Sequence, residues 1–298
     1  MTKPWDPLTG MPDLHGKVAV VTGGNGGIGL VMVKMLALRG AKTLQAECLE
    51  IKQENVHWLA LDLMDLKSIT TAAVELKEKE RKVDILINNA GAGTSATDLV
   101  SYGWEHNMTV NFIGPLVFTN RVLPLLKNAA SEADSDIRIV TLSSIAQSDL
   151  LPSNFKFQFV APTALSNPVP SYPWQWTYIG RSVFGFDMIR ILSIAVHPGA
   201  VATDAALAAS PVPLRSLARR AFLTIEQGVV TPLFAATAKE VREHTEKYNG
   251  KFLIPFGEIG VPNPVVQDEA QVKGLLDITS REVNEHLTSN NLPPLQAW

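Results

Sequence analysis

Short apolar runs alternate along this chain with longer segments in which apolar residues recur every three or four positions. The first run, residues 18–21, precedes a segment in which Ile28, Met32 and Leu36 are spaced one helical turn apart. A short apolar run bounded by turn residues predicts a buried strand, and the helical spacing predicts a helix packed on it. The alternation of such units is typical of an α/β fold with a parallel sheet.

Further apolar runs predict strands at residues 56–63, 83–88, 137–144, 191–196 and 252–254. The strands at residues 56–63 and 83–88 end in polar residues, at the carboxyl edge where doubly wound sheets bind ligands. Residues 41–55 must hold both a strand and a returning helix, yet residues 41–50 show helical spacing and weak strand character. We therefore expect the strand after the first helix to be truncated or absent.

Helices dominate the last third of the chain. Residues 214–224 predict a basic amphipathic helix, Thr224 and Gln227 form a capping box that opens the next helix, and residues 267–287 predict a polar C-terminal helix. We divide the chain into a Pro-rich lead-in at residues 1–15 and a single domain at residues 16–298. Residues 146–181 form an irregular insertion rich in aromatic residues and proline. It is interpreted as a hydrophobic lid over a lipophilic substrate, or as aromatic packing on the sheet edge or on a partner subunit.

The turn between the first strand and helix is rich in glycine, with the sequence Thr-Gly-Gly-Asn-Gly-Gly-Ile-Gly at residues 22–29. Without Cβ atoms at Gly23, Gly27 and Gly29, the turn can be tight and an anion can approach the bare amides and the positive end of the helix dipole. This arrangement predicts a phosphate site. An ordinary loop is the alternative for such a turn taken by itself.

Composition narrows the possible functions. The 298 residues are 46% hydrophobic with a net charge of −3, so the chain can bury a large core. The basic residues are dispersed, and we expect no nucleic-acid partner. The single Cys48 excludes an internal disulfide and is compatible with a reducing compartment. No run of about 18 apolar residues occurs, so we expect no transmembrane segment and a cytoplasmic location. We expect no metal site.

Four further motifs follow the glycine-rich turn in a fixed order: Asn-Asn-Ala-Gly at residues 88–91, Asn111 within a helix-like segment, Ser143-Ser144 at a strand end, and residues 198–203 with the sequence Pro-Gly-Ala-Val-Ala-Thr. This series resembles the short-chain dehydrogenase/reductase family over roughly residues 16–260, and in particular its retinol-dehydrogenase-like branch. The resemblance implies a doubly wound parallel sheet, Rossmann-like, in three α/β/α layers.

The resemblance also implies an activity: NAD(P)-dependent oxidoreduction of a lipophilic alcohol or carbonyl compound, with secondary or lipid metabolism as the expected setting. It implies a small lipophilic substrate and allows a homo-oligomer. NADP is favoured over NAD by the resemblance alone. The acid or arginine that would distinguish the two cofactors at the ribose 2′ position belongs to the end of the second strand, which we expect to be truncated or absent. The chain's own residues therefore leave that choice open.

By the same resemblance, individual residues receive roles. Asn111 holds a water of the proton relay, and Ser144 hydrogen-bonds the substrate oxygen. A kink in the helix and an ordinary hydroxyl at a strand end are their structural alternatives. The cofactor positions are, for the pyrophosphate turn, Gly23, Asn25, Gly27, Ile28 and Gly29; for adenine, Asp62; for the adenosine ribose, Asn89 and Gly91; and for the nicotinamide carboxamide, Val201 and Thr203.

The family's tyrosine, with a lysine four residues later, has no counterpart in residues 145–197. Tyr178 is the nearest candidate acid, but Ser182 stands at the lysine position, and Arg181 lies about 100° away on a helix. Too few residues separate Tyr178 from Pro198 for a strand and a crossover of about a dozen residues or more. We therefore expect two shortened crossover elements. The chain is either an active oxidoreductase or an impaired derivative, such as a splice or gene-model variant or a binding protein, with slow turnover and lower stability.

Overall fold

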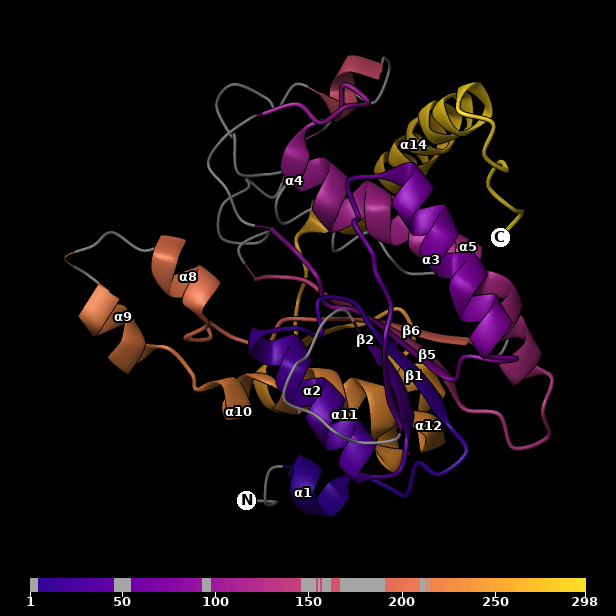
Figure 1. Ribbon diagram of the computed structural model, residues 1–298. Coiled ribbons are helices and arrows are strands. Elements are labelled where there is room, and N and C mark those ends of the chain that lie inside the picture. Colours follow the sequence, from indigo (N-terminus) through magenta and orange to yellow (C-terminus); the bar gives the residue numbers. More distant parts are fainter. Residues whose placement is uncertain are drawn as a thin grey trace.

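The computed structural model describes residues 5–45, 55–92, 98–145, 154, 156, 162–166, 191–209, 213 and 215–298. Within them, one sheet has the strand order β3-β2-β1-β4-β5-β6-β7-β8 (Figure 1). Strands β1 to β7 pair in parallel, and β8 is antiparallel to β7. The strands are β1 (Val18–Val21), β2 (Lys42–Gln45), β3 (Val56–Trp58), β4 (Ile85–Asn88), β5 (Ile137–Leu142), β6 (Ile191–Val196), β7 (Phe252–Ile254) and β8 (Glu258–Ile259).

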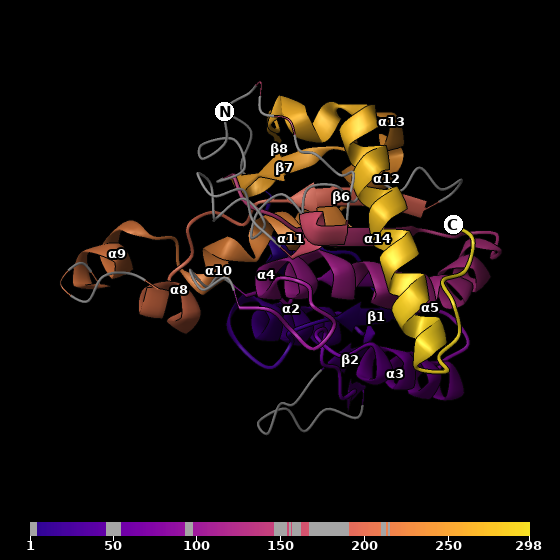
Figure 2. The same cartoon turned by 90° about the horizontal axis from the view of Figure 1, so that it is seen from above.

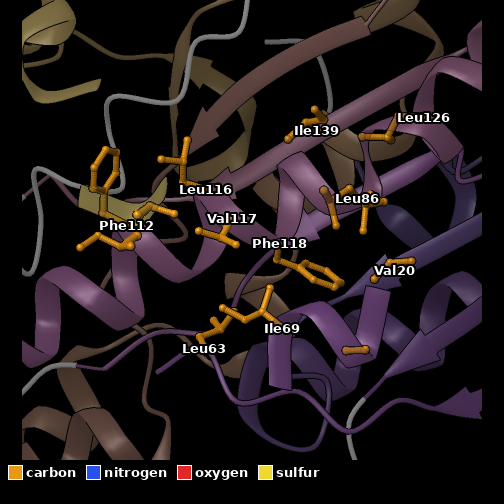
Figure 3. Packing of buried hydrophobic residues seen from close by; sticks show 14 of the residues in the cluster. Val20, Leu63, Ile69, Leu86, Phe112, Leu116, Val117, Phe118, Leu126 and Ile139 are labelled. Atoms are coloured by element: carbon orange, nitrogen blue, oxygen red, sulfur yellow. The ribbon is translucent and has the colours of Figure 1, made fainter. Parts of the chain in front are cut away.

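Helices cover both faces of this sheet, which gives the three layers expected of a doubly wound fold (Figures 1 and 2). One face carries α3 (Leu66–Lys79), α5 (Gly114–Ala130) and α14 (Glu269–Ser289), and Figure 3 shows the apolar core that packs there. The other carries α1 (Pro7–Gly10), α2 (Gly27–Leu38), α11 (Val230–Thr237) and α12 (Lys239–Glu243). Because both faces are covered, β1, β4, β5 and β6 are buried along their whole length.

Shorter elements connect these layers. A π-helical turn, η1 (Thr109–Ile113), joins α4 (His106–Met108) to α5. Two short helices, α8 (Asp204–Ala209) and α9 (Arg215–Ala221), project from the sheet, and α9 has no buried residue (Figures 1 and 2). The remaining elements are η2 (Pro162–Leu165), α10 (Ile225–Gly228), α13 (Thr245–Tyr248), η5 (Pro255–Gly257) and η6 (Pro264–Gln267).

The sequence predicts a second strand that is truncated or absent, and its absence is wrong, because β2 is present and pairs with β1 on one side and β3 on the other. Lys42 is opposite Val18, and Thr43, opposite Ala19, is completely buried. Without β2, the backbone groups on this side of β1 would lack partners, so tertiary pairing outweighs the helical spacing of the local sequence. Residues 46–54, where the helix returning from β2 would lie, are outside the described residues.

The strand predicted at residues 56–63 is also shorter than expected, because β3 ends at Trp58. β3 is the edge strand, and its last partner is Gln45, where β2 ends. Among the described residues no strand pairs with the chain beyond Trp58, and the chain continues to α3 through Asp62 and Asp65. Asp62 therefore belongs to a loop and not to the end of a strand.

The C-terminal predictions agree well with the structure. Thr224 and Gln227 make both hydrogen bonds of the capping box at the start of α10.

Part of the predicted N-terminal lead-in packs on the domain, since the Trp5 ring lies edge-on against the Phe234 ring at a centroid distance of 5.6 Å. The insertion at residues 146–181 lies almost entirely outside the described residues. Across the described part of the chain, no helix is both long and apolar enough to cross a bilayer.

Candidate active site

The glycine-rich turn between β1 and α2 depends on its glycines at three positions. Gly23 and Gly27 have φ values of +65° and +51°, which favour glycine. Gly29 is crowded instead, because a Cβ there would lie 2.2 Å from the Gly23 carbonyl oxygen. Gly26 faces open space, with no atom within 4 Å of an added Cβ. The turn is therefore tight on its protein side and open on the other.

Asn89 fixes this turn to the end of β4. Its side-chain Nδ2 donates to the main-chain oxygens of Thr22 and Gly23, at 2.8 and 3.2 Å. In return, the Thr22 hydroxyl oxygen accepts the main-chain N–H groups of Asn89 and Ala90, each at 3.0 Å. The ends of β1 and β4 are thus held together by side chains, and the amide nitrogen of Asn89 supports the turn.

A cleft of about 870 Å³ opens beside this turn, at the carboxyl ends of the parallel strands. Nine of the residues assigned to the cofactor line it: Gly23, Asn25, Gly27, Ile28, Gly29, Asp62, Asn89, Gly91 and Thr203. Sequence reasoning missed the other lining residues, which are Gly26, Leu61, Leu63, Met64, Ala90, Ala92, His106, Val110, Leu142, Pro198, Asp204, Ala205 and Ile225. The helical spacing of His106 and Val110, together with Val110 being next to Asn111, could have revealed these two.

Val201 is placed differently from the other predicted cofactor residues. Its side chain is 5% exposed and packs against Gly228, where an added Cβ would lie 2.5 Å from Val201 Cγ2. Its backbone also bridges to Leu223. This side chain therefore fills the interior beneath the cleft, while Thr203, two residues later, reaches the cleft wall.

Asn111 lies in the π-helical turn η1, a kind of irregularity that is frequent at functional sites. Its side chain is 1% exposed and makes two hydrogen bonds with one residue. Oδ1 accepts the main-chain N–H of Ala92 at 2.9 Å, and Nδ2 donates to the Ala92 oxygen at 2.8 Å. Asn111 thereby holds the segment that follows Gly91 against the start of α5.

Ser144 lies just beyond β5, two residues after the cleft-lining Leu142. The main-chain N–H of Ser143 donates to the Val196 oxygen at 2.7 Å, so the β5–β6 ladder extends to the residue before Ser144. Ser144 is half-buried at the carboxyl edge of the sheet. Tyr178, the candidate acid, lies outside the described residues.

Asp62 lies in the loop between β3 and α3, which also lines the cleft. One of its carboxylate oxygens accepts the Met64 N–H at 2.8 Å, and its own N–H donates to the Ser68 hydroxyl at 2.9 Å. The loop ends at Asp65, whose side chain caps α3. The carboxylate of Asp62 is therefore presented at a fixed place in the cleft wall.

The cleft offers a dinucleotide both hydrogen-bond donors and an acceptor. Helix α2 begins at Gly27, and its N-cap Gly26 provides no side-chain hydrogen bond, so a ligand can reach the amides of the first turn. The open side of Gly26 leaves room for a pyrophosphate, which the N-terminus of a helix binds well. Asp62, at the other wall, offers a carboxylate acceptor.

Known proteins of one family are similar to this chain in sequence and in fold. The short chain dehydrogenase family profile matches residues 17–155. A short chain dehydrogenase/reductase of Gibberella zeae is 36% identical, over 95% of this chain and 86% of its own length. Several solved structures share the fold. An NADPH-bound carbonyl reductase from chicken fatty liver has a TM-score of 0.60 and 22% identity, over 88% of this chain and all of that chain.

Another solved structure with this fold is a 3-ketoacyl-(acyl-carrier-protein) reductase from Brucella melitensis, complexed with NADH. It has a TM-score of 0.59 and 20% identity, over 81% of this chain and 97% of that chain. The ordered motifs, the glycine-rich turn beside the cleft and the match over nearly the whole chain agree with one another. The chain belongs to the short-chain dehydrogenase/reductase family of oxidoreductases.

Proposed function

We propose that the protein binds NADP or NAD in this cleft, with NADP favoured, and interconverts a lipophilic alcohol and its carbonyl compound. The observation that carries the proposal is the open glycine-rich turn, which leads into a cleft large enough for a dinucleotide. The two solved relatives with NADPH and NADH support a nicotinamide cofactor. When bound, that cofactor supplies the hydride.

The chain's own residues would bind the cofactor and orient the substrate in the following way. The first turn of α2 binds the pyrophosphate, Asp62 accepts from the adenine, and Asn89 keeps the turn in shape. Asn111 fixes the Ala92 segment. Ser144 would donate a hydrogen bond to the substrate oxygen and so orient the carbonyl.

A lipophilic substrate is supported by the wall at the ends of β5 and β6. Leu142 at the end of β5 and Pro198 just after β6 line the cleft, as do Ala205 of α8 and Ile225 of α10, and all four side chains are apolar. Such a wall binds apolar groups by removing their surface from water. The resemblance to the retinol-dehydrogenase-like branch points to the same class of substrate.

Binding and turnover test this proposal separately. We expect NADPH to quench the tryptophan fluorescence of the purified protein with saturation, and NADPH oxidation to accompany the addition of aromatic or steroid-like ketones. Ser144→Ala should lower kcat about 100-fold, because a hydrogen bond to the developing oxyanion is lost, and should leave the NADPH Kd unchanged. Ser143→Ala is the matched control at the neighbouring position. An S144A enzyme with full kcat would contradict the role given to this serine.

A second candidate is a family derivative that binds the dinucleotide without turning it over. It is favoured by the lack of a tyrosine followed four residues later by lysine in residues 145–197. This candidate predicts saturable NADPH binding with no oxidation by any ketone. Robust oxidation that is lost in Tyr178→Phe would eliminate it and would identify Tyr178 as the acid.

A further inference from the structure

His106 is a cleft residue to which the family resemblance gives no role. It is the first residue of α4 and lines the cleft together with Val110, one helical turn later. Its main-chain N–H donates to the Asp98 oxygen at 2.9 Å, which fixes the start of the helix. The buried Glu105 caps the same helix through the Met108 N–H at 2.6 Å. The imidazole is therefore carried by a well-anchored turn.

The contacts of this turn place His106 at one end of the cleft. The Tyr102 hydroxyl accepts the Leu66 N–H and donates to Asp65, both at 3.1 Å, so the segment before α4 packs on the loop after β3. Gly114, just after η1, approaches the same loop so closely that a Cβ would lie 2.3 Å from the Leu63 oxygen. The segments on both sides of His106 therefore pack on the loop of Asp62, Leu63 and Met64, and all four of these residues line the cleft.

The surroundings of the imidazole decide which of its nitrogens can meet a ligand. Nδ1 is buried and has no hydrogen-bond partner among the described residues. Nε2 is neither buried nor bonded to any residue in those ranges, so it lies at the accessible edge of the ring. An orphaned buried N–H is rarer in proteins than an orphaned buried acceptor, so the hydrogen of the neutral ring belongs on Nε2. His106 thus presents a donor to the cleft.

We propose that His106 donates a hydrogen bond from Nε2 to the adenosine part of the bound dinucleotide, at an adenine ring nitrogen or a ribose oxygen. The inference rests on the proposed function, which places the dinucleotide in this cleft. Adenine has several ring-nitrogen acceptors and one amino group, so it needs a donor besides an acceptor such as Asp62. The proposed function places the pyrophosphate at α2, the substrate oxygen at Ser144 and the adenine at Asp62, in the loop on which the segments beside His106 pack, so the adenosine is the part nearest to His106.

Calorimetric titration of the full chain with ADP-ribose, which lacks the nicotinamide, tests this contact. In His106→Gln the side-chain amide places an N–H near the position of Nε2, whereas in His106→Asn it lies near Nδ1. We expect H106N and H106L to weaken ADP-ribose binding about tenfold, and H106Q to stay within about threefold of the wild type. Denaturant unfolding of each variant verifies the fold.

Two results would overturn the inference: H106L binding ADP-ribose as tightly as the wild type, or H106Q being as weak as H106L. Nicotinamide mononucleotide, which lacks the adenosine, should bind equally to all four proteins, and a parallel loss of its binding in H106L would also contradict a local contact. Failure of the proposed function has a different signature, because the wild type itself would then bind neither ADP-ribose nor NADPH.

Discussion

Arg138 shows how one charged residue can belong to a buried strand. It lies in β5 and is 1% exposed, yet its guanidinium donates to the Ala235 and Ala238 oxygens at 3.0 and 2.9 Å and pairs with Asp136. The two carbonyls lie at the carboxyl end of α11, where backbone acceptors lack helical partners and a positive charge is favoured. Arg138 therefore joins the sheet to α11. Its place in a strand could be predicted, whereas its partners, remote in sequence, could not.

The Tyr248 phenol makes the stability of the protein depend on pH. It is 2% exposed and donates to Glu240 Oε1 at 2.5 Å, while its ring packs against Phe234. Burial, and secondly the neighbouring Glu240, raise the pKa of Tyr248 above that of an ordinary tyrosine. A raised pKa contributes stability that is complete below the unfolded pKa of about 10 and is lost as the pH rises through the folded pKa.

We therefore expect the free energy of unfolding of the wild type to fall above about pH 10. Tyr248→Phe keeps the ring, loses about 1 kcal/mol at pH 8 because the hydrogen bond is gone, and shows a shallower decline at high pH. Urea unfolding between pH 8 and 11 measures both effects. The decline left in Y248F belongs in part to Tyr102, whose pKa is also raised by burial. Equal slopes for the two proteins would contradict this account.

At the scale of elements, the local signals were reliable wherever a few neighbouring residues determine the conformation. The capping box of α10, the strand β6 and the C-terminal helix α14 formed close to the predicted positions. The structure differs from the predictions at β2 and β3, and β8 was not predicted; these three strands lie toward the edges of the sheet. Their extent depends on which strand lies alongside, and a strand such as β8 (Glu258–Ile259) carries almost no periodicity of its own.

The turn between β1 and α2 allows a matched pair of glycine variants. Gly29→Ala forces a Cβ against the Gly23 oxygen and Asn89 Nδ2, so we expect a loss of about 1–3 kcal/mol of stability and at least tenfold weaker NADPH binding. Gly26→Ala has an extended backbone and open space, so its stability should stay within about 0.5 kcal/mol of the wild type. Thermal unfolding and NADPH titration measure both variants. Wild-type binding by a folded G29A protein would argue against a pyrophosphate at this turn.

At the scale of the whole molecule, the C-terminal segment covers α5 on one face of the sheet. Helix α14 and the tail after it run along α5, where Leu292 and Leu295 pack on the core (Figure 2). The Asn120 side chain donates to the Gln296 oxygen and accepts its N–H, both at 2.9 Å. Arg121 donates to the carbonyls of Pro293 and Pro294. These two polar residues of α5 are buried because the tail covers them.

Removing residues 290–298 should therefore destabilise the protein by roughly 3–5 kcal/mol, from lost hydrogen bonds and two leucines returned to water. The uncovered face of α5 should also promote self-association, because it exposes apolar surface. Denaturant midpoints and sedimentation velocity measure the two effects. Asn120→Asp, which loses the donor to Gln296 but keeps the tail, should produce only part of the destabilisation. A truncated protein as stable as the full chain would show that the tail only rests on α5.

The sequence by itself determined the family, the alternation of strands and helices, and the glycine-rich turn with most of the residues around it, because these depend on short stretches of chain. Only the tertiary structure decided that β2 pairs with β1, that Val201 faces the interior, that His106 enters the cleft and that the C-terminus covers α5. Each of these results from contacts between segments far apart in sequence. Local periodicity reports which residues are buried, but it does not report what they are buried against.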